Sequence, residues 1–354
     1  QKAKQLLKKA LIREPEKINL LLEYADLLYS KQSFELALIC YKQALTINPT
    51  ETRAQANIAE SLAELQRPHE ALSFIEMALS RNPNSKRLAL NRALTLLSLK
   101  KYKEGWHAYE ARLSDEIDEA PKRLINIPRW TSQSLTNKTI LVCSEQGVGD
   151  ELLFSAYLPK LAPLAKRIIV ETDPRLVPLF SRSFENLEIY PYSRRVSGTR
   201  VIYDYHWLKQ CRVYPDLFVE AASLPYFLKE THKESVAITP HLKDDINATK
   251  VWKNRLKKIS NGKPLIGLFW RSSLYTNDRK HFYPTIDLWQ PILSLKNVKF
   301  LSLQFDDDSH DISLAKQLFG VNILKVDGIN LRNDFDEIAS LCKGLTGVIA
   351  PSTT

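Results

Sequence analysis

Three prolines divide the first third of this chain into equal lengths, because Pro15, Pro49 and Pro83 lie 34 residues apart. Alanine and glycine keep the same register in three columns, which are Ala25, Ala59 and Ala93; Ala3, Ala37, Ala71 and Gly105; and Ala10, Ala44 and Ala78. Where two helices cross closely, only a small side chain fits between them. The columns therefore predict a stack of helical hairpins.

Large residues fill the complementary columns of the same register, which are Leu28, Leu62 and Leu96, and Tyr41, Ile75 and Tyr109. A period of about 34 residues with a helix-turn-helix pattern is typical of tetratricopeptide repeats. We therefore predict a tetratricopeptide-type α-solenoid over residues 1–113. Its fourth unit departs from the pattern at Arg112, and we interpret that unit as a cap.

The array offers two interpretations. Repeat surfaces commonly bind a peptide or a protein in a groove, but they also serve as spacers or as oligomerisation surfaces. Residues 1–14 supply only the second helix of a hairpin, so we expect further repeats before them. The sequence does not decide between a binding groove and a spacer.

The composition excludes several classes of protein. No apolar run approaches the length of a membrane-spanning helix, and the first residues do not resemble a secretory signal. The four cysteines lie far apart without a CxxC pair, and the seven histidines show no ligand spacing, so we expect a reduced, metal-free protein. We predict a cytoplasmic location, either free or at the membrane periphery.

The formal net charge of +10 predicts acidic partners. The basic residues are scattered rather than gathered in blocks, which fits a site for a phosphorylated small molecule as well as nucleic acid. A nucleic-acid-binding solenoid is therefore the weakest of the functional hypotheses, and we expect no nucleic-acid partner.

Residues 114–138 are predicted to form an ordered linker, with an acidic run, Pro121, Pro128 and one anchoring aromatic residue, Trp130. Strands and helices then alternate. The predicted strands are 139–144, 167–172, 187–190 and 200–203, and the predicted helices are 151–165, 174–183 and 206–212. Apolar strands separated by helices imply a parallel sheet covered on both faces. We assign residues 139–246 to one Rossmann-like domain.

A second alternating series occupies residues 247–354. Its predicted strands are 263–270, 298–303, 321–326 and 347–350, and its predicted helices are 247–259, 286–294, 311–319 and 334–342. A complete domain of this kind would continue with another helix and strand, so we expect the second Rossmann-like domain to be incomplete at its carboxyl end. The fold class is thus a helical array followed by a pair of α/β domains.

The stretch from Thr139 to Pro159 carries the leading candidate for a catalytic residue. It reads as a strand, a turn through Gly147 and Gly149, and a helix that starts with Asp150. Ligands bind at the carboxyl ends of strands in open α/β sheets, so we predict that Asp150 is catalytic. The alternative is a helix N-cap, for which Asp is equally suited.

Other residues near this turn offer further alternatives. Glu145 is an alternative base, and Asp204 and His206 follow another predicted strand, where they would line the acceptor side of a cleft. The Gly-x-Gly pair lacks a third glycine, so a dinucleotide-binding fingerprint is not indicated. The acidic run 306–308 suggests a divalent metal, but a solvated loop explains it better.

Several stretches together resemble bacterial tetratricopeptide-repeat proteins that carry a domain similar to the ADP-heptose:lipopolysaccharide heptosyltransferases, which have the two-domain fold called GT-B. The matching stretches are Glu145-Gln-Gly-Val-Gly-Asp150, Ser223-Leu-Pro225, Ile266-Gly-Leu-Phe-Trp-Arg271, Asn277-Asp-Arg279, Ser302-Leu-Gln304 and Ser352-Thr-Thr354. They spread over residues 101–354. The resemblance implies a GT-B pair of domains and an inverting, metal-independent glycosyltransferase.

The resemblance also implies roles for single residues. Asp150 takes the position of the proposed general base, which would remove the proton of the acceptor hydroxyl, while Gln146 lies in the same loop. The implied donor-binding residues are Arg271, Asn277, Arg279, Gln304, Ser352, Thr353 and Thr354. Ser352 stands where the family has Asp, which puts donor binding in doubt.

Two hypotheses follow. The first is an enzyme that transfers a sugar from a nucleotide-sugar co-substrate, without another cofactor, to a protein or glycan acceptor that the repeats recruit. The second is a scaffold whose glycosyltransferase-like part has lost its chemistry and which only binds partner proteins. For Arg271, a salt bridge is the alternative to phosphate binding.

Overall fold

The computed structural model describes residues 2–228, 240–272 and 283–351. The predicted donor-binding residues Asn277, Arg279, Ser352, Thr353 and Thr354 lie outside these ranges. The described chain divides into two compact units. The first unit comprises 2–125, 194–204 and 223–228, and the second comprises 126–193, 205–222, 240–272 and 283–351.

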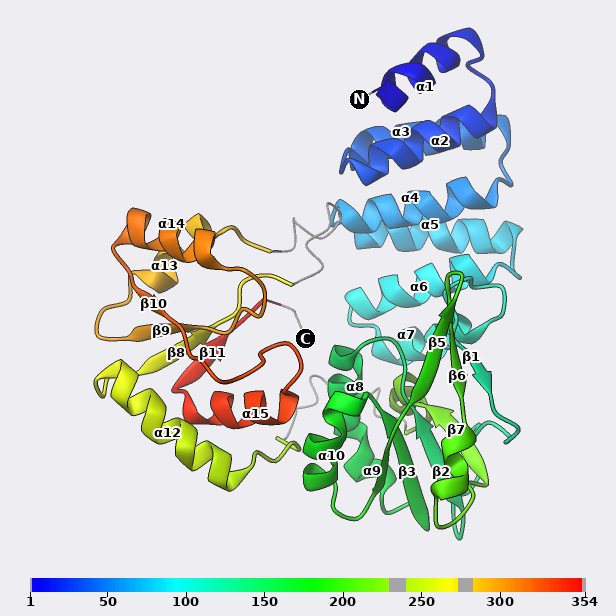
Figure 1. Ribbon diagram of the computed structural model, residues 1–354. Helices are drawn as coiled ribbons and strands as arrows, with labels where there is room; N and C mark the ends of the chain where they lie inside the picture. The colour runs from blue at the N-terminus through cyan, green and yellow to red at the C-terminus, as the bar shows by residue number, and fades with distance from the viewer. Residues whose placement is uncertain (1, 229–239, 273–282, 352–354) are drawn as a thin grey trace. The chain divides into compact units, whose positions relative to one another are not determined.

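The first unit opens with seven helices (Figure 1). They are α1 (Lys2–Arg13), α2 (Ile18–Ser30), α3 (Phe34–Ile47), α4 (Thr52–Glu64), α5 (Pro68–Arg81), α6 (Lys86–Ser98) and α7 (Tyr102–Tyr109). Each helix packs against the next one, so the predicted helical repeat array is confirmed. A short 3-10 helix, Glu110–Leu113, follows α7.

Small side chains lie at the crossings of these helices, as their columns predict. Ala25, Ala37, Ala71 and Ala93 have no exposed surface. A side chain added at Gly105 would approach Leu97 of α6 to within 2.8 Å. The spacing of the small residues therefore sets how closely the hairpins stack.

The turns inside the hairpins use an unexpected residue type. Gln32, Gln66 and Lys100 repeat every 34 residues and have φ values of 59°, 57° and 59°. This left-handed conformation is normally left to glycine, because other side chains are strained in it. The sequence gives no glycine signal at these turns, although the turn geometry repeats as regularly as the helices.

A small three-stranded sheet completes the described part of the first unit, with the order β1-β6-β5. Its strands are β1 (Lys122–Leu124), β5 (Ser193–Ser197) and β6 (Arg200–Asp204), and β1 and β6 run parallel. The prediction that the strand at 200–203 continues the first Rossmann-like sheet is therefore wrong. The predicted linker also contains a strand, β1, although Trp130 is buried as expected of its anchor.

The second unit contains a four-stranded parallel sheet with the order β4-β3-β2-β7. Its strands are β2 (Thr139–Cys143), β3 (Arg167–Thr172), β4 (Glu188–Pro191) and β7 (Leu217–Glu220). Helices α8 (Val148–Phe154), α9 (Leu158–Leu161) and α10 (Val177–Ser183) lie between them in sequence. Every residue of β2 is buried, which explains its continuous apolar pattern. β7 was not predicted from the sequence.

The same unit contains a second parallel sheet, with the order β10-β9-β8-β11. Its strands are β8 (Leu265–Leu268), β9 (Lys299–Ser302), β10 (Ile323–Leu324) and β11 (Gly347–Ile349), and its α-helices are α12 (Ile246–Ser260), the short α13 (Gln290–Leu293), α14 (Ser309–Phe319) and α15 (Phe335–Gly344). All four predicted strands are confirmed. The chain therefore combines a helical repeat array with parallel α/β sheets.

Candidate functional site

Asp150 is the third residue of α8, and a short loop connects the end of β2 to the start of this helix. Its Oδ2 accepts a hydrogen bond of 3.1 Å from the backbone N–H of Gly147, so the carboxylate caps the helix. Burial raises the pKa of Asp150 and outweighs the hydrogen bonds from backbone N–H groups. A raised pKa suits a proton acceptor, but the capping bond already explains the residue type.

The turn before α8 is built differently from the prediction. Gln146 takes the left-handed conformation with φ 59°, whereas Gly147 has φ −121°. A side chain at Gly147 would meet Asp150 Oδ2 at an ordinary 3.7 Å. The bend in this loop therefore depends on Gln146, and Gly147 leaves room beside the carboxylate of Asp150.

Buried carboxylates surround this end of the sheet. Glu151 Oε2 accepts hydrogen bonds from Thr172 Oγ1 at 2.6 Å and from the N–H of Asp173 at 2.8 Å. Burial raises the pKa of Glu151 to about 7. Glu145 Oε2 accepts from the N–H of Ala222 at 3.1 Å. These carboxylates join α8 and the ends of β2, β3 and β7, which is a structural role.

Glu171 belongs to the same buried group. Its Oε2 accepts from the N–H of Ser144 at 3.1 Å and from the hydroxyl of Tyr205 at 3.4 Å. Neither Glu151 nor Glu171 was predicted from the sequence to belong to this site. A single acid among apolar residues is normally predicted to face solvent. The sequence pattern does not show which strand ends lie next to it in the fold and bury it.

Asp204 and His206 do not share a sheet edge with Asp150. Asp204 ends β6 of the small sheet in the first unit, and His206 begins a 3-10 helix, His206–Gln210, of the second unit. His206 is exposed. The strand before them, β6, was predicted to belong to the first Rossmann-like sheet. The strand order shows that it belongs to the small sheet β1-β6-β5 instead.

Arg271 lies among acidic neighbours. Its Nη1 lies 3.2 Å from Asp311 Oδ2 and 3.5 Å from Asp306 Oδ1, and its Nη2 donates to the carbonyl of Asp307 at 2.6 Å. The salt-bridge alternative therefore describes the observed contacts. Arg271, Asp307 and Asp311 border a pocket of about 350 Å³, which Trp270 and His310 also line.

Gln304 also has a structural explanation. Its Oε1 accepts from the backbone N–H groups of Trp270 and Arg271, at 2.8 and 3.0 Å, and its Nε2 donates to the carbonyl of Arg271. Gln304 thus fixes the chain just beyond β8. Among the described residues, no group of three or more His, Cys, Asp or Glu is placed to hold a metal ion.

The first helices of two successive hairpins, α4 and α6, enclose a groove of about 250 Å³. Glu60 and Leu94 line it together with Asn91, whose amide donates to the carbonyl of Ala56 at 3.2 Å. Burial raises the pKa of Glu60, against the opposing effect of Arg87. Leu94 is 50% exposed, so the groove presents an apolar side chain beside a carboxylate.

No protein-family model matches this chain. Protein FlbA of Caulobacter vibrioides is 31% identical over 252 residues, which cover 70% of this chain and 41% of FlbA. The chain therefore spans less than half of the length of this relative. The name of FlbA states no activity.

Solved structures that resemble the chain include MamA (MSR-1 C2), with 19% identity over 33% of this chain and 66% of MamA and a TM-score of 0.29. The first tetratricopeptide-repeat domain of human RPAP3 is 21% identical over 28% of this chain and 78% of that domain, with a TM-score of 0.27. Scores this low do not establish a shared fold. The assignment of tetratricopeptide-like repeats therefore rests on the hairpins and their 34-residue period.

In the part of the chain that the structure describes, the search for a helix with the length and apolar character of a membrane span finds none.

Proposed function

We propose that this protein is a scaffold whose helical repeats bind a segment of a partner protein in the groove between α4 and α6. The observation that carries this proposal is the lining of that groove, where the exposed Leu94 stands with the half-buried Glu60. An exposed apolar side chain beside hydrogen-bonding groups is what a peptide-binding groove needs for affinity and for orientation.

The charge of the groove indicates the chemistry of the partner. Glu60 forms no ion pair with a described residue. Burial raises its pKa, and the negative charges of Glu119 and Glu64 raise it further. Arg87 is the cation that acts on it, and Arg87 is already paired with Glu119 at 3.1 Å. A Lys or Arg next to an apolar residue of the partner would complement this groove.

A photo-crosslinking amino acid in place of Leu94 tests the proposal. In cells, we expect this position to yield a discrete covalent adduct with a partner protein, because Leu94 faces the groove. The same crosslinker at Leu124, which is 48% exposed on β1, is the matched control and should not yield that adduct.

Charge reversal then tests the role of the carboxylate. Glu60→Lys should reduce the Leu94 adduct at least fivefold, and Glu60→Gln should reduce it less. Glu104→Lys, an exposed acid on α7, should leave it unchanged. An adduct of equal yield in Glu60→Lys would rule out this groove as the binding site.

A glycosyltransferase is the second candidate, and a specific feature favours it. Asp150 follows the first strand of a parallel sheet, and its carboxyl has a raised pKa, as a general base requires. Two parallel sheets in tandem are compatible with a GT-B arrangement. The engagement of Arg271 by Asp306 and Asp311 argues against it, because a donor diphosphate would have to displace these contacts.

The enzyme hypothesis is tested by turnover. The intact protein would be incubated with a panel of nucleotide sugars and an extract that contains the acceptor, and release of nucleoside diphosphate would be measured. If Asp150 is the general base, Asp150→Asn should lower turnover by ~10²–10⁴-fold while donor binding persists. Unchanged turnover would exclude Asp150 from the chemistry.

A further inference from the structure

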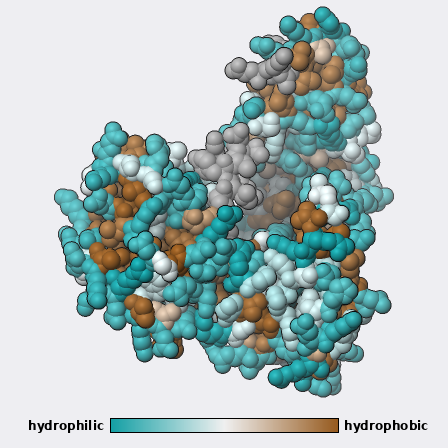
Figure 2. Space-filling view, in the orientation of Figure 1, coloured by the Kyte–Doolittle hydropathy of each residue, from teal (hydrophilic) through white to brown (hydrophobic). Residues whose placement is uncertain are grey.

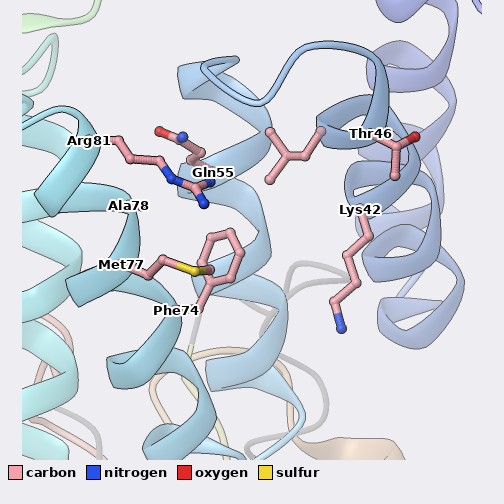
Figure 3. A pocket seen from close by; sticks show the side chains of 8 residues that line it. Lys42, Thr46, Gln55, Phe74, Met77, Ala78 and Arg81 are labelled. Atoms are coloured by element: carbon pink, nitrogen blue, oxygen red, sulfur yellow. The ribbon is translucent and has the colours of Figure 1, made fainter.

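A second pocket of the repeat array lies away from the groove between α4 and α6. It has a volume of about 270 Å³ and is formed mainly by α3 and α5, the second helices of successive hairpins. Phe74, Met77 and Leu45 contribute its apolar lining. Lys42 and Arg81 stand on opposite sides of it, with Phe74 and Met77 between them (Figure 3).

The two helices that form this pocket, α3 and α5, carry exposed apolar side chains, of which Met77 lines the pocket itself. Leu36, Ile39 and Ile47 of α3 are 52%, 59% and 39% exposed, and Met77 of α5 is 45% exposed. Figure 2 shows hydrophobic atoms on the visible face over the first helices of the array, among mostly hydrophilic neighbours. The exposed Met77 beside Phe74 gives the pocket an apolar lining that an apolar side chain of a partner can contact.

Gln55 supplies a buried polar group to the pocket. Its side chain is only 2% exposed, and its Nε2 donates to the carbonyl of Pro49 at 2.9 Å, which fixes the orientation of the amide. Its Oε1 is buried and accepts no hydrogen bond from any described residue. Buried acceptors are nearly always satisfied, so this oxygen calls for a donor from outside the array.

The charges at the rim are uncompensated. Lys42 and Arg81 are both exposed, and neither forms an ion pair with a residue that the structure describes. The charge of Lys42 acts on Glu70, but the pKa of Glu70 is lowered first by its hydrogen bond to Arg67 and only lastly by Lys42. Two cations beside an apolar pocket complement carboxylates that flank an apolar anchor.

We propose that this pocket binds a tryptophan side chain within an acidic segment of a partner protein. Tryptophan combines a large apolar body with one N–H donor and no acceptor, so its indole can fill the space beside Phe74 and Met77 and donate to Gln55 Oε1. Asp or Glu residues on either side of it would pair with Lys42 and Arg81. The pocket is slightly smaller than the ~300–1,000 Å³ of typical ligand sites, so it suits a single side chain.

Binding of three fluorescein-labelled pentapeptides to the intact protein, followed by fluorescence anisotropy, tests this proposal. The probe is Glu-Glu-Trp-Glu-Glu, and the matched peptides are Glu-Glu-Phe-Glu-Glu, which lacks the N–H donor, and Lys-Lys-Trp-Lys-Lys, which reverses the charge. We expect the Kd of the probe to be at least fivefold lower than that of the Phe peptide and at least tenfold lower than that of the Lys peptide.

Variants of the pocket separate its parts. Lys42→Glu combined with Arg81→Glu should raise the Kd of the probe at least tenfold, and Lys103→Glu, an exposed charge on α7, should not change it. Gln55→Leu should make the Trp and Phe peptides bind equally, since the acceptor is gone. Because Gln55 is buried, circular dichroism would confirm that this variant folds.

Two results would overturn the proposal. One is equal affinity of the unaltered protein for the Trp and Phe peptides. The other is full binding of the probe by the variant with Lys42→Glu and Arg81→Glu, in which both rim charges are reversed. A probe that competes with the Leu94 adduct would place its binding in the other groove and also contradict the assignment.

Discussion

Glu151 of α8, which accepts hydrogen bonds from the end of β3, shows how burial acts on a single carboxyl. Its pKa rises from 4.5 to about 7 in the folded protein. Between these values the folded state holds a proton that the unfolded chain has released, so stability falls as pH rises from about 4.5 to 7. With ~1.4 kcal/mol for each pH unit, the loss is on the order of 3 kcal/mol.

Replacing Glu151 by Gln should remove this loss. The amide oxygen can still accept from Thr172 and Asp173, and no charge is buried at high pH. We expect Glu151→Gln to be more stable than the parent at pH 8 by ~2–3 kcal/mol and nearly equal to it at pH 4.5, measured by urea unfolding. Glu116→Gln, at an exposed position, is the control. Parallel pH profiles of Glu151→Gln and its parent would show that Glu151 does not titrate as described.

At the scale of single elements, β8 depends on a close approach that only glycine permits. A methyl group at Gly267 would lie 2.7 Å from Leu303 Cδ1 and 2.8 Å from Leu345 Cδ1. Both leucines pack in the core of this sheet. Gly267→Ala should therefore destabilise the sheet by ~1–3 kcal/mol, because the core is overpacked.

Gly347 of the neighbouring strand β11 provides a matched control. A methyl group there would meet Ile266 Cδ1 at 3.7 Å, an ordinary contact, so Gly347→Ala should be neutral or stabilising by up to ~1 kcal/mol. Hydrogen exchange of the β8 and β9 amides measures both effects. Equal protection in the two variants would mean that the leucines move aside without cost.

Whole-molecule features differed in how far the sequence predicts them. The repeats were predictable because each small residue, such as Ala37 or Ala71, has one packing role that recurs every 34 residues. The sheet that β6 joins could not be predicted. The apolar pattern of Arg200–Asp204 is the same whether this strand pairs with β1 or with β2. β7 was not predicted, although strands of equal or shorter length, such as β8 and β11, were.

The candidate site was predicted in part for a related reason. The motif around Asp150 identified a residue at a strand end, but the capping bond from Gly147 and the buried acids Glu151 and Glu171 depend on contacts between distant segments. The acids around Arg271 were likewise hidden, because Asp311 lies 40 residues away in sequence on α14.

For the whole molecule, the scaffold hypothesis and the enzyme hypothesis make opposite predictions. One experiment with two readouts separates them: the yield of the partner adduct at Leu94 and the rescue of a deletion strain. A scaffold predicts that Asp150→Asn retains both the adduct and the rescue, whereas Glu60→Lys loses both because the groove between α4 and α6 is disabled. Loss of rescue in Asp150→Asn, with the adduct intact, would contradict the scaffold and favour the transferase.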